Sequence, residues 1–425
     1  MSAAPHTASA PPVRAPGLAL MWKTVSADCN IACDYCYYST CRGAVSGRRI
    51  DDALLENTIR EYMEGSDGAA AFAWQGGEPL LAGLAFFERV VALQAKYAPR
   101  NTTIANAIQT NGTLLDDAWA RFFREYNFLV GVSVDGPEAL HDAHRVTATG
   151  KGTHALVMRK IDHLRRREVD FNILTVLHEG NVGRARDLMA FYERERFDFV
   201  QFIPGMAFPA QSPDAPPRYR ISPEQYGAFL CEAFDLWYAG GSPRMSIRLF
   251  DDLLSVHAGH EAGSCKHMRG CSRTLILEQN GDAYPCDFYM GETWKLGNVS
   301  VDSLTSLVER PAYRQFLAMK QNMAAECRRC DYLRFCHGGC PRDRARTESG
   351  MTAGTDYFCA AHRRLFAYAG DRLALLARRI RIRRLVEAVR AGAPWPDRNA
   401  PCVCGSGRKF KRCCAPLRDE LELPR

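Results

Sequence analysis

The sequence of 425 residues has no run of 18 uncharged apolar residues, so we expect no transmembrane helix. Its first 16 residues are rich in Ala, Pro and Ser but lack the compact apolar core of a signal peptide, and we expect a disordered lead-in. Global disorder is excluded, because 47% hydrophobic and 24% charged residues are typical of globular proteins. The sequence therefore predicts a cytoplasmic protein of about two to three domains.

Most of the chain also lacks a basic surplus. Residues 1–360 contain 39 Lys and Arg against 42 Asp and Glu, whereas residues 361–425 contain 16 against 6. The net charge of +7 therefore comes from the C-terminal tail. We do not expect the body of the protein to bind nucleic acid.

Cysteine is abundant, with 17 residues, and in a long chain without an export signal clustered cysteines more often ligate metal than form disulfides. Fifteen fall into three groups: Cys29, Cys33 and Cys36; Cys265, Cys271, Cys286, Cys327, Cys330, Cys336, Cys340 and Cys359; and Cys402, Cys404, Cys413 and Cys414. Cys231 lies in a helical pattern and is expected to be a buried small hydrophobe. Cys41 has no assigned function.

Six strand-like runs alternate with amphipathic helical patterns up to about residue 240. The strand candidates are Leu18–Val25, Ala70–Trp74, Ile104–Gln109, Phe128–Val134, Phe171–Leu177 and Phe199–Ile203. The helical patterns are Ala53–Glu64, Leu81–Tyr97, Asp116–Tyr126, Thr153–Arg167, Val182–Arg194 and Pro223–Tyr238. This alternation predicts an α/β fold with a parallel sheet. A closed eight-unit barrel takes about 250 residues, so six units predict an open, partial barrel.

Changes in composition and hydrophobic periodicity along the chain predict its domains. Beyond the barrel, Gly and Pro interrupt the periodicity and eight cysteines appear, as in small regions held by metal rather than by a large core. A basic helical stretch follows, with Leu373, Leu376 and Ile380 as its buried stripe. The predicted segments are a lead-in (1–16), the barrel (17–240), a cysteine-rich domain (241–360), a basic helix (361–394) and a linker with the last cysteines (395–425).

Polar motifs follow several of the predicted strands. They are Gln75–Pro79, Thr110–Gly112, Ser133–Gly136 and Gln201–Pro204. Because the carboxyl ends of parallel strands meet at one edge of a sheet, we expect these motifs to share one cavity.

The first cysteine group follows the first strand with the spacing Cys-x3-Cys-x2-Cys. Three thiolates are one short of a closed tetrahedral site. An iron–sulfur cube held by three cysteines keeps one iron open to an exogenous ligand, and zinc or a distant fourth cysteine is the alternative.

This spacing, with Tyr35 before the last cysteine, resembles the radical S-adenosylmethionine (SAM) superfamily. The resemblance implies a SAM-binding 4Fe–4S cluster and a 5′-deoxyadenosyl radical that abstracts hydrogen, so that the cofactors carry the difficult step. Taken singly, the matching polar residues could be turn residues, helix caps or a surface arginine. Together they are the expected SAM pocket: Gly76, Gly77, Glu78, Pro79, Asn111, Ser133 and Arg145.

The eight cysteines of the second group suffice for two four-thiolate sites, which suit electron transfer or structure and could hold either iron–sulfur clusters or zinc. Their pattern resembles the SPASM domain of radical SAM enzymes that modify peptides. The resemblance implies two auxiliary 4Fe–4S clusters. One would be held by Cys265, Cys271, Cys286 and Cys340, and the other by Cys327, Cys330, Cys336 and Cys359.

Longer segments resemble the anaerobic sulfatase-maturating enzymes over roughly residues 18 to 365. These segments are Phe72–Pro79, Gln109–Leu114, Gly131–Pro137 and Tyr284–Tyr289. The resemblance implies oxidation of a cysteine or serine, in a Cys/Ser-x-Pro-x-Arg segment of an unfolded sulfatase, to Cα-formylglycine. It also implies an electron donor such as flavodoxin or ferredoxin.

By the same resemblance Asp287 is the base, directly after the cluster ligand Cys286, and Tyr38 and Gln75 lie in the substrate pocket. Loss of a proton and an electron toward neighbouring groups is chemically sensible. An Asp in a loop is otherwise a common turn or cap residue. The alternatives are a maturase of ribosomally made natural-product precursors and a non-catalytic protein that binds several zinc ions.

The tail contains Cys-x-Cys-x8-Cys-Cys, formed by Cys402, Cys404, Cys413 and Cys414. Four soft ligands in a short segment predict a tetrahedral zinc site without which the segment cannot fold, and a redox pair at Cys413 and Cys414 is the alternative. The segment resembles the SEC-C motif of the preprotein translocase motor. We therefore expect it to recruit an export chaperone, a ribosome or a nascent chain. Contact of the basic helix with nucleic acid lacks a supporting motif.

Overall fold

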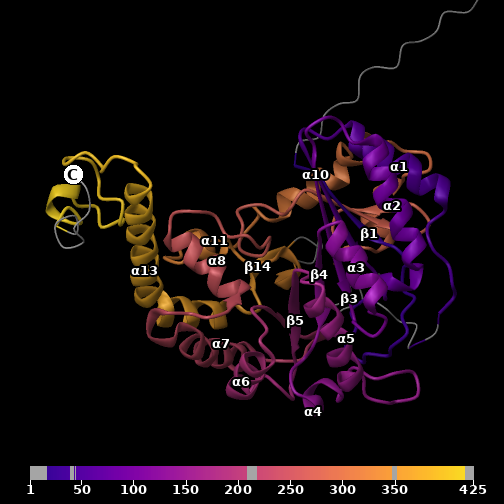
Figure 1. Cartoon of the computed structure of the whole chain (residues 1–425), viewed down its shortest axis with the longest axis horizontal. Coiled ribbons are helices and arrows are strands. Elements are labelled where there is room, and N and C mark those ends of the chain that lie inside the picture. Colours follow the sequence, from indigo (N-terminus) through magenta and orange to yellow (C-terminus); the bar gives the residue numbers. More distant parts are fainter. Residues whose placement is uncertain (1–16, 39–42, 44, 208–217, 347–351, 417–425) are drawn as a thin grey trace, which may run out of the picture. The chain divides into compact units, whose positions relative to one another are not determined.

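The computed structural model describes residues 17–38, 43, 45–207, 218–346 and 352–416 (Figure 1). Cys41 and the predicted lead-in lie outside these residues. The chain forms two compact units: unit 1 comprises Met1–Asn181, Ile203–Arg220 and Ser272–Gln321, and unit 2 comprises Val182–Phe202, Ile221–Cys271 and Asn322–Arg425. The units interleave along the chain, whereas the domains expected from the sequence are consecutive, and those domain boundaries stay predictions.

Unit 1 is built on a mixed sheet with the strand order β12-β11-β10-β1-β2-β3-β4-β5. Neighbours from β10 to β5 are parallel, while β10, β11 and β12 pair antiparallel. The strands are β1 (Ala19–Lys23), β2 (Ala69–Gln75), β3 (Thr103–Thr110), β4 (Phe128–Ser133), β5 (Phe171–Leu177), β10 (Thr274–Glu278), β11 (Asp282–Tyr284) and β12 (Gly297–Asn298). The predicted parallel sheet is confirmed for the first five strands.

Strands β10 to β12 were not expected. They lie in the region that the sequence predicts to be loop-rich, yet β10 pairs with β1 from Ala19↔Thr274 to Lys23↔Glu278. The run Thr-Leu-Ile-Leu-Glu of β10 is short, but its three central residues are buried. Placed next to β1, this strand brings Glu278 to the same edge of the sheet as Lys23.

Helices alternate with the strands of unit 1 as the sequence predicts. They are α1 (Asp52–Glu64), α2 (Leu84–Tyr97), α3 (Asp117–Glu125), α4 (Glu138–His141), α5 (His154–Arg166), α9 (Leu304–Val308) and α10 (Pro311–Met319), with 3-10 turns η1 (Pro79–Ala82) and η3 (Glu292–Trp294). The expected helix over 81–97 is divided at Gly83, whose φ of +83° ends η1 before α2 begins.

The sheet buries one face under these helices. In β2, alternate residues Ala70, Phe72 and Trp74 are buried. The Trp74 ring packs against Trp22 of β1 at a centroid distance of 5.8 Å and against Phe87 of α2 at 5.5 Å. The neighbouring residues of the same strands therefore project to the opposite face, and Lys23 and Gln75 meet there in register.

Unit 2 contains β6 as far as Phe202, the short strand β9, a set of helices and the cysteine-rich tail. Its helices are α6 (Ala185–Glu195), α7 (Pro223–Tyr238), α8 (Arg248–His257), α11 (Ala325–Arg328), α12 (Leu333–Cys336) and α13 (Cys359–Arg390), with turns η2 (Ala239–Gly241), η4 (Pro341–Asp343) and η5 (Phe410–Arg412). Its strands are β9 (Ser246–Ile247), β13 (Arg344–Arg346) and β14 (Thr352–Asp356), while β6 (Phe199–Pro204) runs into unit 1. The short pair β7 (Met206–Ala207) and β8 (Arg218–Tyr219) belongs to unit 1.

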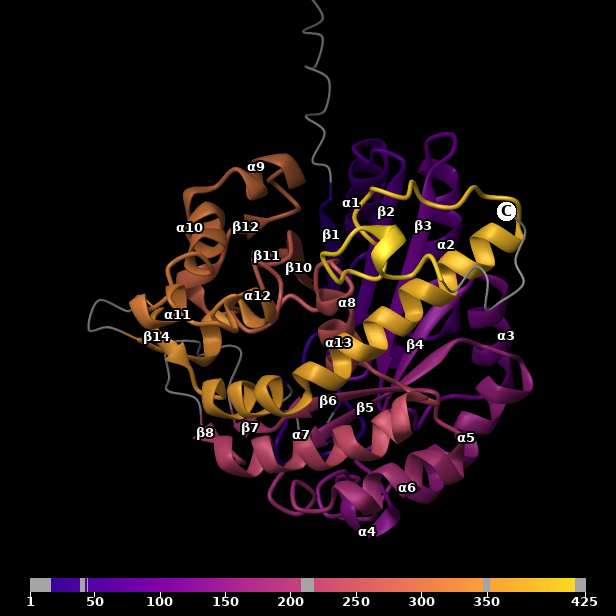
Figure 2. The same cartoon turned by 90° about the vertical axis from the view of Figure 1, so that its left-hand side faces the viewer.

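Helix α13 is the basic helix that the sequence predicts. Leu373 and Leu376 are buried as expected, and Ile380 is half-buried. Figure 2 shows α13 running beside α7, where Arg372 forms a 2.6 Å ion pair with Asp235. Cys231 of α7 is buried, as predicted.

Within the part of the chain that the structure describes, no helix is both long and apolar enough to span a membrane.

Candidate functional site

The first cysteine group lies in the loop after β1, and backbone contacts hold this loop to the glycine-rich loop after β2. The Gly77 N–H donates to the Ser26 carbonyl at 2.7 Å, and the Glu78 N–H donates to the Asp28 carbonyl at 2.8 Å. A Cβ at Gly77 would lie 1.9 Å from the Asp28 carbonyl oxygen. Glycine is therefore required here because the two backbones touch, which fixes where the cysteine loop begins.

Glu78, an expected SAM-pocket residue, joins β2 to β3 through its buried carboxylate. The carboxylate accepts hydrogen bonds from the Thr110 hydroxyl at 2.8 Å, the Asn111 N–H at 2.7 Å and the Leu80 N–H at 3.1 Å. Burial raises the pKa of Glu78 to about 7, although these hydrogen bonds oppose the shift. Both carboxylate oxygens already accept hydrogen bonds from the protein. We therefore assign Glu78 the role of positioning the loops after β2 and β3.

Cys29 and Cys33 have surroundings that suit an anionic cluster. The Asn111 side-chain amide donates to the Cys29 sulfur at 3.7 Å, and the Arg145 guanidinium donates to the Cys33 sulfur at 4.0 Å. Burial raises the pKa of Cys29 to about 12 and that of Cys33 to about 11. The thiols would stay protonated at neutral pH without a metal, whereas bound iron or zinc would hold the thiolates.

Arg145 belongs to a buried group that the sequence did not predict as a unit. Its Nε lies 2.9 Å from Asp135 Oδ2, and the Tyr35 hydroxyl also donates to this oxygen. The other oxygen of Asp135 accepts the Val176 N–H at 2.9 Å. Burial acts to raise the pKa of Asp135, but the charges of Arg145 and His141 and the hydrogen bonds from Tyr35 and Arg145 together hold this pKa below its usual value. Arg145 is thus held at the cysteine loop by a carboxylate from the end of β4.

Ser133 and Gln75 end their strands at the same edge of the sheet. The Ser133 hydroxyl accepts a hydrogen bond from the Gln109 amide at 3.1 Å. The side-chain oxygen Oε1 of Gln75 accepts one from Lys23 Nζ at 3.3 Å. Hydrogen bonds therefore join the polar ends of β1 and β2 and of β3 and β4. A cavity shared by these motifs and by Gln201–Pro204 stays a prediction.

A second polar group centres on Lys23, which sequence reasoning missed. The Lys23 side chain is 0% exposed, forms an ion pair with Asp287 and lies 4.4 Å from the Tyr38 ring centroid. With its hydrogen bond to Gln75, it contacts all three residues predicted to be catalytic. The sequence signal that could have identified Lys23 is a charged residue at the end of an otherwise apolar strand.

Three further residues orient this group. The Tyr37 hydroxyl donates to Asp287 Oδ2, the Tyr38 hydroxyl donates to Glu278 Oε1 at 2.8 Å, and the Ser26 hydroxyl donates to the other oxygen of Glu278. Burial, reinforced by the neighbouring carboxylates, raises the pKa of both tyrosines well above its usual value, so that both remain donors. Asp287 keeps 15% of its side chain exposed. The arrangement presents a fixed carboxylate beside the cysteine loop.

Four cysteines of the second group line one pocket in unit 2. They are Cys327, Cys330, Cys336 and Cys359, and Asp356 and His362 also line this pocket. The four residues share one pocket, as a common site would require, and the cluster itself stays a prediction. Of the other predicted set, Cys265, Cys271 and Cys340 belong to unit 2, and Cys286 belongs to unit 1 after β11. Their shared cluster stays a prediction.

The tail cysteines fit a single tetrahedral ion. Sulfur atoms of Cys402, Cys404, Cys413 and Cys414 all lie within 4.8 Å of one another, with 3.4 Å between Cys404 and Cys413. Zn–S bonds of about 2.3 Å give sulfur separations of about 3.8 Å in a tetrahedron. Ile382 and Leu385 of α13 pack against this cysteine cluster. The Arg381 guanidinium donates to the Cys404 carbonyl at 2.7 Å, which ties the segment to the helix.

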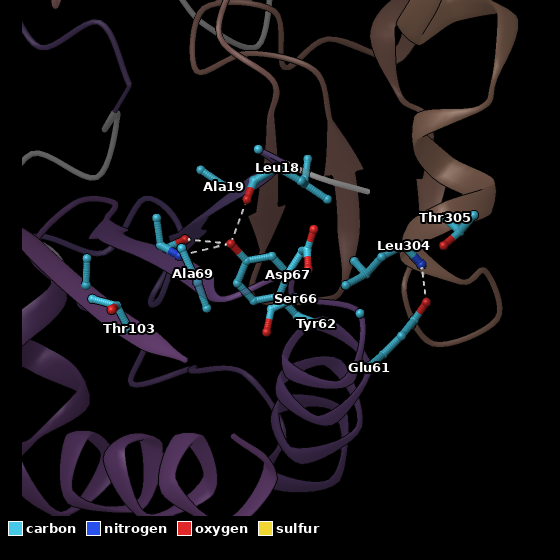
Figure 3. Close-up of a pocket in the computed structure, with 15 residues that line it drawn as sticks. Leu18, Ala19, Glu61, Tyr62, Ser66, Asp67, Ala69, Thr103, Leu304 and Thr305 are labelled. Atoms are coloured by element: carbon cyan, nitrogen blue, oxygen red, sulfur yellow. Dashed lines mark hydrogen bonds between the residues drawn. The ribbon is translucent and has the colours of Figure 1, made fainter. Parts of the chain in front are cut away.

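A cavity of about 280 Å³ lies at the opposite, N-terminal ends of β1, β2 and β3 (Figure 3). Small residues such as Ala19, Ala69 and Ala105 line it. The Tyr62 hydroxyl donates to the Leu18 carbonyl at 2.7 Å, and Glu61 accepts the Leu304 N–H at 2.7 Å. Because these polar groups form hydrogen bonds with nearby backbone groups, we assign no chemistry to this cavity.

Comparisons with known proteins agree with this geometry. The Radical SAM superfamily model matches residues 24–191, the SPASM iron-sulfur cluster-binding domain matches 265–331, and the SEC-C motif matches 398–416. The cysteine-type anaerobic sulfatase-maturating enzyme of Clostridium perfringens (strain 13 / Type A) is 36% identical over 371 residues, which cover 86% of this chain and all of that protein. The serine-type enzyme of Bacteroides thetaiotaomicron is 35% identical, covering 83% of this chain and 89% of that protein.

A solved structure also matches. Native anSMEcpe with bound AdoMet (SAM) and the Cp18Cys peptide superposes with a TM-score of 0.79 at 35% identity, covering 86% of this chain and all of that one. The fold expected from the sequence, a radical SAM barrel followed by a SPASM domain, is confirmed. The chain belongs to the anaerobic sulfatase-maturating enzymes of the radical SAM superfamily.

Proposed function

We propose that this protein oxidises a cysteine or serine, in a Cys/Ser-x-Pro-x-Arg segment of an unfolded sulfatase, to Cα-formylglycine. The observation that carries the proposal is the group around Lys23, which joins Asp287, Gln75 and Tyr38 beside the three-cysteine loop. Relatives named for both cysteine and serine substrates support either target residue. We place the protein in the reducing cytoplasm, where flavodoxin or ferredoxin would donate electrons to it.

Cys29, Cys33 and Cys36 would hold a 4Fe–4S cluster, and Gly76, Gly77, Asn111, Ser133 and Arg145 would surround SAM. When bound, these groups supply the 5′-deoxyadenosyl radical, which removes a hydrogen atom from the target Cβ. Arg145 and Asn111 donate hydrogen bonds toward the cysteine sulfurs and would stabilise their negative charge. The two SPASM sets of four cysteines would hold the auxiliary clusters.

Asp287 is the proposed base. After the hydrogen atom leaves Cβ, the side chain must lose one electron and the thiol or hydroxyl proton to form C=S or C=O. A cluster held by the SPASM cysteines would take up that electron, and water then converts C=S to the aldehyde with release of hydrogen sulfide. Asp287 takes that proton, while Tyr37 and Lys23 keep its two oxygens in place. Gln75 and Tyr38 contact Lys23 in the same group and would orient the target residue.

We expect the protein, reconstituted without oxygen, to convert the cysteine of a Cys-Thr-Pro-Ser-Arg peptide to an aldehyde when SAM and a reductant are supplied. Mass spectrometry follows the cysteine, and chromatography follows 5′-deoxyadenosine. An unmodified peptide accompanied by 5′-deoxyadenosine would refute this substrate class and favour another peptide, such as a natural-product precursor. A colourless protein containing only zinc would exclude radical chemistry altogether.

For the tail, we propose a zinc-bound module that recruits an export chaperone, a ribosome or a nascent chain, because a sulfatase destined for export must be modified before it folds. The four converging sulfurs and the adjacent basic helix support this proposal.

We expect the double variant Cys402→Ser/Cys414→Ser to lose one zinc ion per chain and to lower chaperone or ribosome co-purification and cellular sulfatase activity. Its turnover of the isolated peptide should stay unchanged, because these cysteines lie outside the group around Lys23. Zinc analysis, pull-down and the peptide assay measure the three effects. The matched control is Cys231→Ser, a buried cysteine outside the motif. If the variant without zinc still recruited the chaperone or ribosome as the wild type does, the proposed role of the tail would be wrong.

A further inference from the structure

The tail module, residues 398–416, has little apolar core of its own. Among its described side chains, Phe410 is the only large apolar one that is buried, and it lies in a cluster with three of the four tail cysteines. A segment this short with so small a core is stable only with a bound metal or a packing partner. Ile382 and Leu385 of α13 pack against this cluster and complete the core from outside the module.

The last turns of α13 are packed differently from the rest of the helix. Eight of the nine buried residues of α13 precede Arg378, and Val389 is the one that follows it. In the last turns, Ile382 and Leu385 are half-buried, and the surface that they contact is the cysteine cluster of the module (Figure 1). These turns therefore lose apolar contacts when the module unfolds.

Like charges oppose the helix just where the module contacts it. Five arginines fall within seven consecutive residues, Arg378, Arg379, Arg381, Arg383 and Arg384. Arginines three or four residues apart on a helix repel one another. The Arg381 guanidinium donates to the Cys404 carbonyl at 2.7 Å, and a zinc ion held by four thiolates would carry a net negative charge beside these arginines. The zinc-bound module thus supplies both an apolar contact and an opposing charge.

We propose that the zinc-bound module holds the last turns of α13, Ile382–Arg390, in the helical state, and that these turns unfold when the module loses zinc. The inference rests on the zinc site of the proposed function. The first part of α13 stays helical without zinc, because Leu365 and Leu373 are buried and Arg372 pairs with Asp235 of α7 at 2.6 Å. Zinc occupancy therefore sets the length of α13 and the arrangement of its arginines.

Hydrogen exchange followed by mass spectrometry tests this dependence in the full chain, reconstituted without oxygen. In the zinc-free variant Cys402→Ser/Cys414→Ser, amides of Ile382–Arg390 should exchange faster by about tenfold or more, whereas amides of Cys359–Ala377 should keep the wild-type rate. Zinc is removed by substitution because a chelator would also attack iron–sulfur clusters. The control Cys231→Ser changes a buried cysteine outside the module and should leave exchange in both segments unchanged.

A second variant, Leu385→Ala, tests the contact itself without touching a zinc ligand. Alanine has the higher helix propensity, so faster exchange over Ile382–Arg390 in this variant must come from the lost packing against the module. The matched control is Leu375→Ala, the same change in the same helix at a position where the side chain is 43% exposed. We expect faster exchange in Leu385→Ala and the wild-type rate in Leu375→Ala.

Wild-type exchange over Ile382–Arg390 in the zinc-free variant, or an equal change in the controls, would overturn the inference. If the zinc-free variant also exchanges faster throughout α7, it is destabilised as a whole, and Leu385→Ala decides alone. If the last turns respond as expected but chaperone or ribosome recruitment does not change, the partner role of the tail fails and the zinc-dependent helix stands. If zinc analysis finds no zinc in the wild type, both the zinc site and this inference fall.

Discussion

Asp287→Asn is expected to lower aldehyde formation on the cysteine peptide by about 100-fold or more, the usual contribution of a general base, while 5′-deoxyadenosine still forms. Asparagine has nearly the same shape and can still accept the hydrogen bond from Tyr37, but it cannot take a proton from the target thiol. The ratio of aldehyde to 5′-deoxyadenosine, measured by mass spectrometry and chromatography, should therefore fall by a similar factor.

Glu292→Gln is the matched control, because it makes the same carboxylate-to-amide change at an exposed position of unit 1, five residues further along the chain. Its aldehyde yield should equal that of the wild type. A wild-type aldehyde yield in Asp287→Asn would remove Asp287 from the base role. Loss of 5′-deoxyadenosine as well would instead show that the variant disturbs the cysteine loop.

Arg145→Met is expected to lower the free energy of local opening around β4 and β5 by about 3–5 kcal/mol, because it leaves the Asp135 carboxylate buried without its cation. Asp135 is 0% exposed and bonds the Val176 N–H of β5 directly. Hydrogen exchange followed by mass spectrometry should therefore show faster exchange in peptides that cover Phe171–Leu177.

Arg121→Met provides the comparison on the surface. Arg121 is 62% exposed and pairs with Asp117 one helical turn away, so we expect a loss of about 0.5 kcal/mol or less. Replacing both partners, in Arg145→Met/Asp135→Leu, should recover part of the loss because no buried charge then remains. Exchange at the wild-type rate in Arg145→Met would contradict the structural role of this pair.

The strand–helix repeats and the cysteine groups could be predicted from the sequence because both are local. Alternation of apolar residues needs only a few neighbours, so the expected strand at Leu18–Val25 matches β1 at Ala19–Lys23, and the helix at Thr153–Arg167 matches α5 at His154–Arg166. The spacing Cys-x3-Cys-x2-Cys likewise lies within one loop. Resemblance to known families then supplied Asp287, Tyr38 and Gln75, which the structure brings together around Lys23.

What the sequence could not show is which distant residues meet. Strand β10 adds to β1 by backbone hydrogen bonding, which leaves no mark on residue spacing, and only this pairing places Glu278 beside Tyr38 and Ser26. Lys23 and Asp287 stand far apart in the chain, and Lys266 reaches Asp343 and Asp356 only after folding. The family, the barrel repeats and the types of ligand follow from local sequence pattern. The charge pairs follow only from the folded chain, because pairing depends on sheet register and burial rather than on local pattern.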